Sequence, residues 1–310
     1  MNLKLIFNRK KILLINFILI STYSFCQNYI EIFKINGNTT PYNSFDTSSS
    51  KTKINQLDVD LTVPIKLNDK LSIITGIIYE DIKAKLFEDG EIKRFGSTTI
   101  KLGANKKFND KWAGTLVALP KIASDYLQIS NKDFQLGALG LFKYKKNDNL
   151  SYKFGLYYNA ELFGPFFVPM LGFYYLSPNK KFESNIMMPL QADINYKISS
   201  FICIGINFNG QTRSYHLTNV KPEYHSTYIS KVSNDFYGYL KFNIKKGLSI
   251  QTKFGQSIGR SLKVYDENDK VKFGLPATYI GPKRNQLNTK FANGFIFQLS
   301  LSYKVFLDKK

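Results

Sequence analysis

The chain contains little of several residue types on which protein chemistry often depends. Its 310 residues include 2 cysteines, 2 histidines and 1 tryptophan. Glycine-rich phosphate loops, Cys/His zinc spacings and the Gly-x-Ser-x-Gly motif are all missing from the sequence. These absences argue against the common nucleotide-binding, zinc-binding and α/β-hydrolase classes, so we expect no catalytic site, no metal site and no cofactor.

Long hydrophobic runs are also missing. A transmembrane helix needs about 20 apolar residues, and the single apolar run, over residues 12–20, is shorter. That run follows four cationic residues, and small residues at 24 and 26 precede Gln27, which is typical of a secretory signal peptide. We therefore predict a cleaved signal over residues 1–26 and one domain over 27–310. A lipid anchor on Cys26 is disfavoured by the bulky Phe25, and after cleavage Cys203 is the only thiol, which excludes an intramolecular disulfide.

What the chain does contain is a repeated alternation of apolar and polar residues. In residues 56–67 Leu, Val and Ile occupy every odd position, while the even positions are mostly polar. Successive side chains of a strand point to opposite faces, so this pattern predicts a strand with one apolar face. The same pattern returns in residues 150–158, 202–209 and 295–305.

An apolar sheet face can contact lipid or a soluble core, and alternation alone does not distinguish the two. Here the strands are too many for a small soluble barrel, and no amphipathic helices are available to cover a sheet. The polar face also carries Lys, Asp, Asn and Gly. These features favour a transmembrane antiparallel up-and-down β-barrel over the alternative, a secreted β-sandwich.

Turn residues set the predicted topology. Asn-Asp pairs at 68–69, 109–110 and 147–148 favour tight turns, and longer polar stretches alternate with them near 37–51, 83–93, 121–132, 210–233 and 261–290. Short periplasmic turns and longer extracellular loops are typical of outer-membrane barrels. The expected barrel has fourteen strands, or twelve if the weakest pair around Pro189 is one bent strand. The predicted strands are 28–36, 52–67, 71–82, 94–108, 111–120, 133–145, 150–159, 166–177, 181–187, 190–198, 201–209, 233–245, 248–260 and 291–307.

Aromatic and basic residues are both abundant. The 26 Phe and 20 Tyr are expected to form girdles at the two membrane interfaces, with Phe108 and Trp112 near one tight turn and Phe163 and Phe166 near one rim. The net charge of +20 is spread along the chain without a nucleic-acid-binding motif, so we expect anionic outer-membrane lipids as partners and no nucleic acid. The aromatic C-terminal strand ending near Phe306 predicts recognition by barrel-assembly machinery.

Six charged residues are predicted to line the lumen, because they lie on the polar faces of the expected strands. They could select which small solutes pass, or they could pair with opposite charges and simply fill the barrel. The sequence favours neither role. The six residues are Asp58, Asp60, Glu80, Lys101, Lys153 and Lys241.

Two loops contain weaker candidates for chemistry. His225 and Ser226 with Glu223 have the residue types of a lipid hydrolase, and His216, Glu223 and His225 could instead bind a metal. Spacing within one loop fixes no geometry, so ordinary exposed histidines are the expected reading. The acidic segment Asp266, Glu267 and Asp269, with Asp193, lacks the glycine and the distal glutamate of a calcium loop and is expected to be solvated.

Several longer stretches resemble a known family. Residues 161–183, with the segment Phe-Gly-Pro-Phe-Phe-Val-Pro at 163–169, are similar to a domain-of-unknown-function family of outer-membrane β-barrels from Bacteroidota. Segments at 237–240, 246–248 and 257–261 resemble it too. The resemblance covers nearly the whole mature chain. It implies a barrel in the cell outer membrane and brings no known activity, so no catalytic residue is carried over.

The sequence as a whole predicts an outer-membrane barrel that is not an enzyme, most simply a narrow channel or passive small-solute transporter. Two alternatives stay open at this point. One is an integral lipid-modifying enzyme built on residues 210–233, and the other is a structural or adhesive barrel that acts through its extracellular loops.

Overall fold

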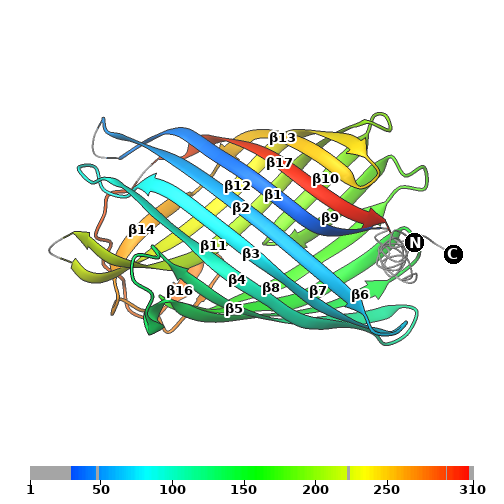
Figure 1. Ribbon diagram of the computed structural model, residues 1–310, viewed down its shortest axis with the longest axis horizontal. Helices are drawn as coiled ribbons and strands as arrows, with labels where there is room; N and C mark the ends of the chain where they lie inside the picture. Colours follow the sequence, from blue (N-terminus) through cyan, green and yellow to red (C-terminus); the bar gives the residue numbers. More distant parts are fainter. Residues whose placement is uncertain (1–28, 47–48, 222–223, 291, 307–310) are drawn as a thin grey trace, which may run out of the picture.

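The protein is a closed antiparallel β-barrel in a computed structural model that describes residues 29–46, 49–221, 224–290 and 292–306 (Figure 1). The predicted signal peptide lies outside these residues. The strands are β1 (Tyr29–Ser44), β2 (Lys51–Lys66), β3 (Leu71–Lys85), β4 (Ile92–Lys107), β5 (Trp112–Ser124), β6 (Phe134–Lys145), β7 (Leu150–Glu161), β8 (Gly164–Leu176), β9 (Phe182–Met188), β10 (Gln191–Lys197), β11 (Ile202–Lys221), β12 (Tyr224–Lys245), β13 (Leu248–Ser257), β14 (Ser261–Asp266), β15 (Phe273–Leu275), β16 (Thr278–Ile280) and β17 (Gly294–Phe306).

Fourteen strands, β1 to β13 and β17, form the wall, which confirms the larger of the two predicted counts. Each wall strand pairs with its neighbours in the chain, β13 pairs with β17, and β17 pairs with β1 from Tyr29↔Phe306 to Thr39↔Phe297. Every wall strand therefore has a hydrogen-bonded neighbour on each side, and no strand edge is left open. Such closure is what allows strands to lie in lipid, where no water is available for unpaired backbone groups.

The wall has an apolar outer face and a polar inner face. Along β2, Leu57, Leu61 and Ile65 expose 39%, 38% and 48% of their surface, although they are hydrophobic. The residues between them point inward, where Thr62, for example, accepts a hydrogen bond from Lys101 on β4. A continuous belt of exposed aliphatic and aromatic side chains on a closed barrel is stable only against lipid.

The two ends of the barrel differ. Tight turns join β2–β3, β4–β5, β6–β7, β8–β9, β10–β11 and β12–β13 at one end, which also holds the start of β1 at Tyr29 and the end of β17 at Phe306 (Figure 1). The connections at the opposite end include residues 86–91, 125–133 and 258–293. We call these the turn end and the loop end. Among the described residues the single helix is the short 3₁₀ turn Asn131–Asp133, and no helix is long and apolar enough to cross a membrane.

The alternation rule was wrong over residues 210–233, which were predicted to be a polar loop. They continue β11 and β12 as one long antiparallel hairpin, from Gly210↔Asn234 to Lys221↔Tyr224. Polar residues are compatible with strands wherever neither face contacts lipid, and this hairpin has no lipid face because it leaves the wall. Residues 261–290 likewise contain β14, which pairs with β12, and the β15–β16 hairpin.

Two smaller predictions can also be settled. β9 and β10 are separate strands joined by a turn at Pro189 and Leu190, so the alternative of one bent strand was wrong. Phe163 and Phe166 are 0% and 3% exposed and lie inside the barrel, not in an interfacial girdle. Phe108 and Trp112 do sit at the turn end, where Phe108 stacks on Phe142 and Trp112 packs at a tilt against Tyr144.

The two faces of β2 predict different costs for an added charge. Leu61→Arg places a charge in the lipid belt, which costs about 2–4 kcal/mol near the bilayer midplane, whereas Thr62→Arg places it in the polar interior. We expect the fraction of folded barrel in lipid vesicles, measured by heat-modifiable migration on gels, to fall much more for Leu61→Arg. Equal losses for the two variants would contradict the assignment of faces.

Candidate functional site

The part of β11 and β12 beyond the wall, residues 210–233, fills the loop-end half of the lumen, and we call it the lumen hairpin. It leaves the wall because β10 begins at Gln191, whose partner on β11 is Asn209. Beyond Asn209, β11 no longer pairs with β10. Its free edge instead reaches the end of β5, where His216 pairs with Ser124, and Figure 1 shows these ends of β11 and β12 at the loop end.

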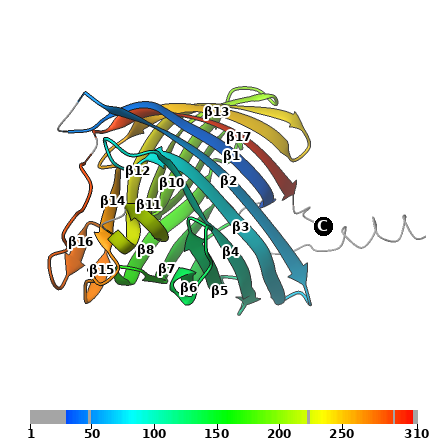
Figure 2. The ribbon, with the colours of Figure 1, turned by 60° about the vertical axis from the view of Figure 1, so that its left-hand side comes forward.

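Both faces of the lumen hairpin are packed against the inner wall. Tyr215, Leu217 and Ile229 lie on one face and join a cluster with Ile82 on β3 and Phe95 on β4. On the other face, Tyr228 joins a second cluster with Phe163, Phe166, Val168 and Met170 around β8. These side chains are at most 3% exposed, so the interior at this level is packed like a protein core. Figure 2, turned by 60°, shows β11 and β12 enclosed by the other strands.

One polar anchor of the hairpin is Glu80 on β3, whose side chain is 3% exposed. Lys231 of the hairpin donates to its carboxylate at 2.6 Å, and the Tyr215 hydroxyl donates at 2.5 Å. Arg213 lies 4.0 Å away. A buried carboxylate is costly unless it is paired and hydrogen-bonded, so Glu80 strongly favours the position of the hairpin in which these partners surround it.

A second anchor lies at Glu161, the last residue of β7, four strands along the wall from β3. Its carboxylate accepts hydrogen bonds from the backbone N–H of Ser214 at 2.6 Å and from the Ser214 hydroxyl at 2.5 Å. Lys121 on β5 lies 3.5 Å from the same carboxylate, and both side chains are almost fully buried. The hairpin is thus bonded to the inner wall at two strands, β3 and β7.

Near its tip the hairpin takes part in a network of hydrogen bonds and one ion pair. The carboxylate of Asp133 lies 2.7 Å from Nδ1 of His216, and Nε2 of His216 lies 3.0 Å from the Ser226 hydroxyl. Ser226 donates to Glu267 at 2.7 Å, and Lys132 forms a short ion pair with Glu267. The hydrogen bonds from Lys132 and Ser226 lower the pKa of Glu267. These contacts join the hairpin to the two longest loop-end connections.

The geometry changes the roles suggested for the two histidines. Ser226 contacts His216, which was predicted only as a metal ligand. Glu223 and the side chain of His225 lie outside the described residues. Among the residues that are described, no three His, Cys, Asp or Glu side chains converge to hold a metal.

The acidic residues weighed for calcium have other contacts. Asp269 accepts a hydrogen bond from the backbone of Asn285, Asp266 accepts from Asn268, and Glu267 is paired as described above. Asp193 lies far along the chain on β10 and accepts from Tyr239 and Asn207. The four residues therefore do not form one site.

The six predicted lumenal residues all lie on inner-facing positions of their strands. Asp60 and Lys101 form an ion pair across β2 and β4, and Asp58 accepts from Asn38 and Gln56. Lys153 donates to Asn185 at 2.7 Å. Lys241 differs from these, because it lines a cavity at the turn end. Whether any of the six selects solutes stays a prediction.

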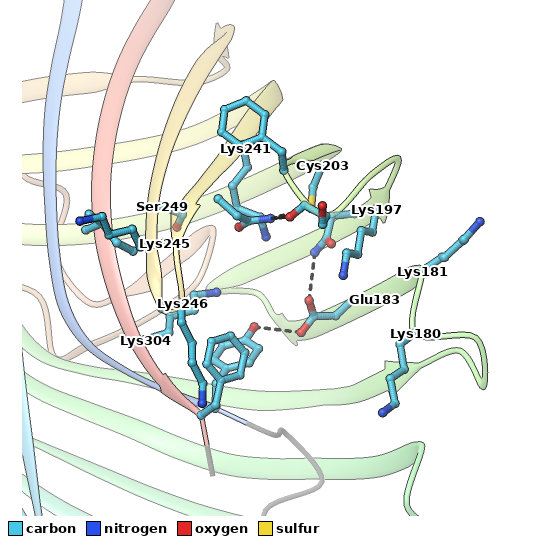
Figure 3. A pocket seen from close by; sticks show the side chains of 18 residues that line it. Lys180, Lys181, Glu183, Lys197, Cys203, Lys241, Lys245, Lys246, Ser249 and Lys304 are labelled. Atoms are coloured by element: carbon cyan, nitrogen blue, oxygen red, sulfur yellow. Dashed lines mark hydrogen bonds between the residues drawn. The ribbon is translucent and has the colours of Figure 1, made fainter. Parts of the chain in front are cut away.

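The turn-end half of the lumen opens into a cavity of about 540 Å³. Its lining includes Asn195, Cys203, Asn243 and Ser249, one residue from each of the four wall strands β10 to β13. Figure 3 shows Glu183 held between Tyr29 and Asn195, with labelled lysines from several strands and turns around it. This cavity contains seven lysines and one acid: Lys180, Lys181, Lys197, Lys241, Lys245, Lys246 and Lys304, with Glu183.

Comparison with known proteins identifies the family. Residues 31–304 match a domain of unknown function, DUF6268. The chain belongs to this family. No curated protein matches the chain in sequence.

Solved structures share the barrel at very low identity. The COG4313 outer membrane channel from Pseudomonas putida F1 has 8% identity and a TM-score of 0.46, over 92% of this chain and 100% of that one. The TodX monoaromatic hydrocarbon channel has 8% identity and a TM-score of 0.39, over 90% of each chain. The NanC porin has 9% identity and a TM-score of 0.36, over 88% of this DUF6268 chain and 100% of the porin.

The anchor at Glu80 generates a prediction about the hairpin. Lys231→Ala leaves the buried Glu80 carboxylate without its closest cation, and breaking a buried pair in this way costs about 3–5 kcal/mol. We expect backbone amides of residues 210–233 to exchange hydrogen about tenfold faster or more, while wall amides of β2 and β3 are unchanged. Lys66→Ala, which removes the exposed pair with Asp69, serves as the control and should change neither.

Proposed function

We propose that the protein is a gated outer-membrane channel for small solutes, in which the lumen hairpin is the gate. The observation that carries this proposal is that the hairpin is not needed to close the wall. The wall is complete through Asn209 and Asp235 on β11 and β12, and the extra residues lie in the path a solute would take.

The contacts of the hairpin suit an element that can leave. The hairpin is held at Glu80 and Glu161 by hydrogen bonds and ion pairs. Each of these carboxylates also accepts a hydrogen bond from a wall residue, Gln56 in the case of Glu80 and Asn159 in the case of Glu161. Water entering an opening lumen could replace these bonds, and those wall partners would stay beside each carboxylate. The turn-end cavity is already open, so displacement of the hairpin would open the loop-end half of the lumen as well.

The first test is conductance of a barrel without the gate. Replacing residues 212–232, between the paired Gln211 and Ser233, with an Asn-Gly turn should leave the wall folded, because the β10–β11 and β12–β13 pairings that close it end at Asn209 and Asp235. In a planar bilayer we expect steady current steps from this variant and closed traces with rare openings from the intact chain. A folded variant that stays silent would overturn the channel proposal.

The contact between His216 and Ser226 raises hydrolysis as a second candidate function. Asp133, His216 and Ser226 have the order and the distances of a Ser-His-Asp triad. Ser226 has a single hydroxyl hydrogen, however, and its oxygen lies 2.7 Å from the Glu267 carboxylate as well as 3.0 Å from His216. A hydroxyl that donates to Glu267 is not activated by His216. We therefore propose that this network fixes the hairpin tip and is not catalytic.

A serine-directed probe separates the two roles of Ser226. We expect a fluorophosphonate to leave the refolded mature chain unlabelled, and phospholipid in the vesicles to stay intact. Labelling that disappears in Ser226→Ala but persists in Ser230→Ala, a matched change on the same strand, would instead establish a hydrolase.

A further inference from the structure

We propose that the turn-end cavity is a binding site for small organic anions that carry two or more carboxylate or phosphate groups. This names the solute class of the proposed channel and rests on that proposal for its role in transport, although binding itself can be measured without conduction. The anion site is defined here as the cavity of about 540 Å³ and its seven lysines. A volume of this size holds a small organic molecule.

The first argument is that acids are arranged unevenly around the turn end. On the arc formed by β2 to β7, each turn carries an aspartate three residues after a lysine, in the pairs Lys66–Asp69 (2.7 Å), Lys107–Asp110 (2.9 Å) and Lys145–Asp148 (2.6 Å). Hydrogen bonding to these lysines lowers the pKa of Asp69 and of Asp110, so they stay ionised. On the arc formed by β8 to β13 none of the three turns carries an acid, the β8–β9 and β12–β13 turns carry lysines, and this is the arc that the cavity opens onto.

The second argument is that the cavity lysines lack counter-charges. Six of the seven make no ion pair with any described residue. The seventh, Lys304, lies 3.7 Å from the carboxylate of Glu31, which does not line the cavity. The one acid of the cavity, Glu183, is already hydrogen-bonded to Tyr29 at 2.9 Å and to Asn195 at 3.4 Å. Several like charges around one cavity repel each other, and a bound anion relieves that repulsion.

A third, independent observation lies deeper in the lumen. Lys253 on β13 is 6% exposed, and its ammonium is held by the Asn207 carbonyl oxygen at 2.9 Å and by the rings of Tyr237 and Tyr239. No described carboxylate pairs with it. Lys253 shares its strand and its inner face with Ser249 of the anion site, four residues closer to the turn. A buried lysine that no described carboxylate pairs with offers an N–H donor to an anion deeper in the lumen than the anion site.

The lining also accounts for the kind of anion. Asn195, Asn243 and Ser249 offer amide and hydroxyl groups between the lysines, which suits a hydroxylated molecule better than an apolar one. The lysines come from the β8–β9 turn, β10, β12 with its turn and β17, so a ligand with a single charge would contact few of them. A ligand with two or more anionic groups bridges several.

Phospholipid head groups carry the same phosphate chemistry and lie at the same depth as the turns. The site is formed by inner-face residues such as Lys241 and Asn195, whose strand neighbours Leu240 and Tyr196 are exposed to lipid on the outside. We therefore assign it to soluble anions, and the experiment includes a lipid arm.

The test uses the refolded mature chain, residues 27–310, in a non-ionic detergent, with binding measured by isothermal titration calorimetry. The probes are inorganic pyrophosphate and citrate. We expect both to bind, and Lys241→Gln/Lys245→Gln/Lys246→Gln to weaken binding about tenfold or more, equivalent to about 1.4 kcal/mol. The matched control Lys70→Gln/Lys111→Gln/Lys146→Gln removes the same charge from the opposite arc and should change affinity less than about twofold, since exposed charges farther than the Debye length are screened.

Three outcomes would overturn the assignment: no binding of either probe, equal loss in the two triple variants, or binding of dihexanoyl phosphatidylglycerol but of neither probe. The last outcome would make the cavity a lipid site. Failure here is distinct from failure of the channel proposal. A barrel that binds citrate but never conducts keeps the anion site, and a gateless barrel that conducts without binding either probe keeps the channel.

Discussion

The whole structure depends on the requirement that backbone hydrogen bonds be satisfied within the protein. A chain whose outer face is apolar over its full circumference must satisfy every backbone N–H and C=O internally, and for strands only a closed barrel does so. The pairing of β17 with β1 completes that closure. Where two strands approach very closely, a side chain would prevent them from pairing. A Cβ at Gly255 would lie 1.8 Å from the carbonyl oxygen of Phe236 on β12, so glycine is required there.

The interior of a closed barrel is filled either by side chains or by water. The two halves of this lumen differ in which of them fills the space. In the loop-end half the lumen hairpin brings tyrosine, leucine and isoleucine against the wall and supplies Lys231 and Ser214 to buried carboxylates. In the turn-end half nothing comparable enters, and lysines border a water-accessible cavity. The same wall therefore encloses a packed region and an open one. The boundary between them depends on how many residues β11 and β12 extend beyond the short strands β9 and β10.

Such a division gives the barrel a direction. The turn end presents an accessible cationic cavity, whereas the loop end holds a hairpin bonded to β3, to β7 and to two loops. The charged residues predicted from alternation belong to both halves. Glu80 acts in anchoring the hairpin and Lys241 lies in the cavity, so a common inward orientation does not imply a common role.

Much of the wall could be predicted from the sequence, because a period of two is imposed locally by strand geometry. The segment 56–67 contains enough alternation to fix its own apolar face, and Asn-Asp pairs such as Asn109-Asp110 mark turns by their tolerance of tight backbone conformations. The site could not be predicted in the same way. Residues 210–233 have no lipid-facing register, so their polar composition was indistinguishable from that of a loop.

The partners of the hairpin lie far from it in the chain: Tyr215 meets Glu80 across 135 residues, and His216 meets Asp133 across 83. No local pattern specifies such pairs. The sequence by itself determined a β-barrel with one oily face and fourteen strands at most, since those follow from side-chain alternation and turn chemistry. Only the tertiary structure decided that two strands turn inward, which carboxylates they bury, and where seven lysines meet, because these depend on the order and tilt in which the closed wall brings distant strands together.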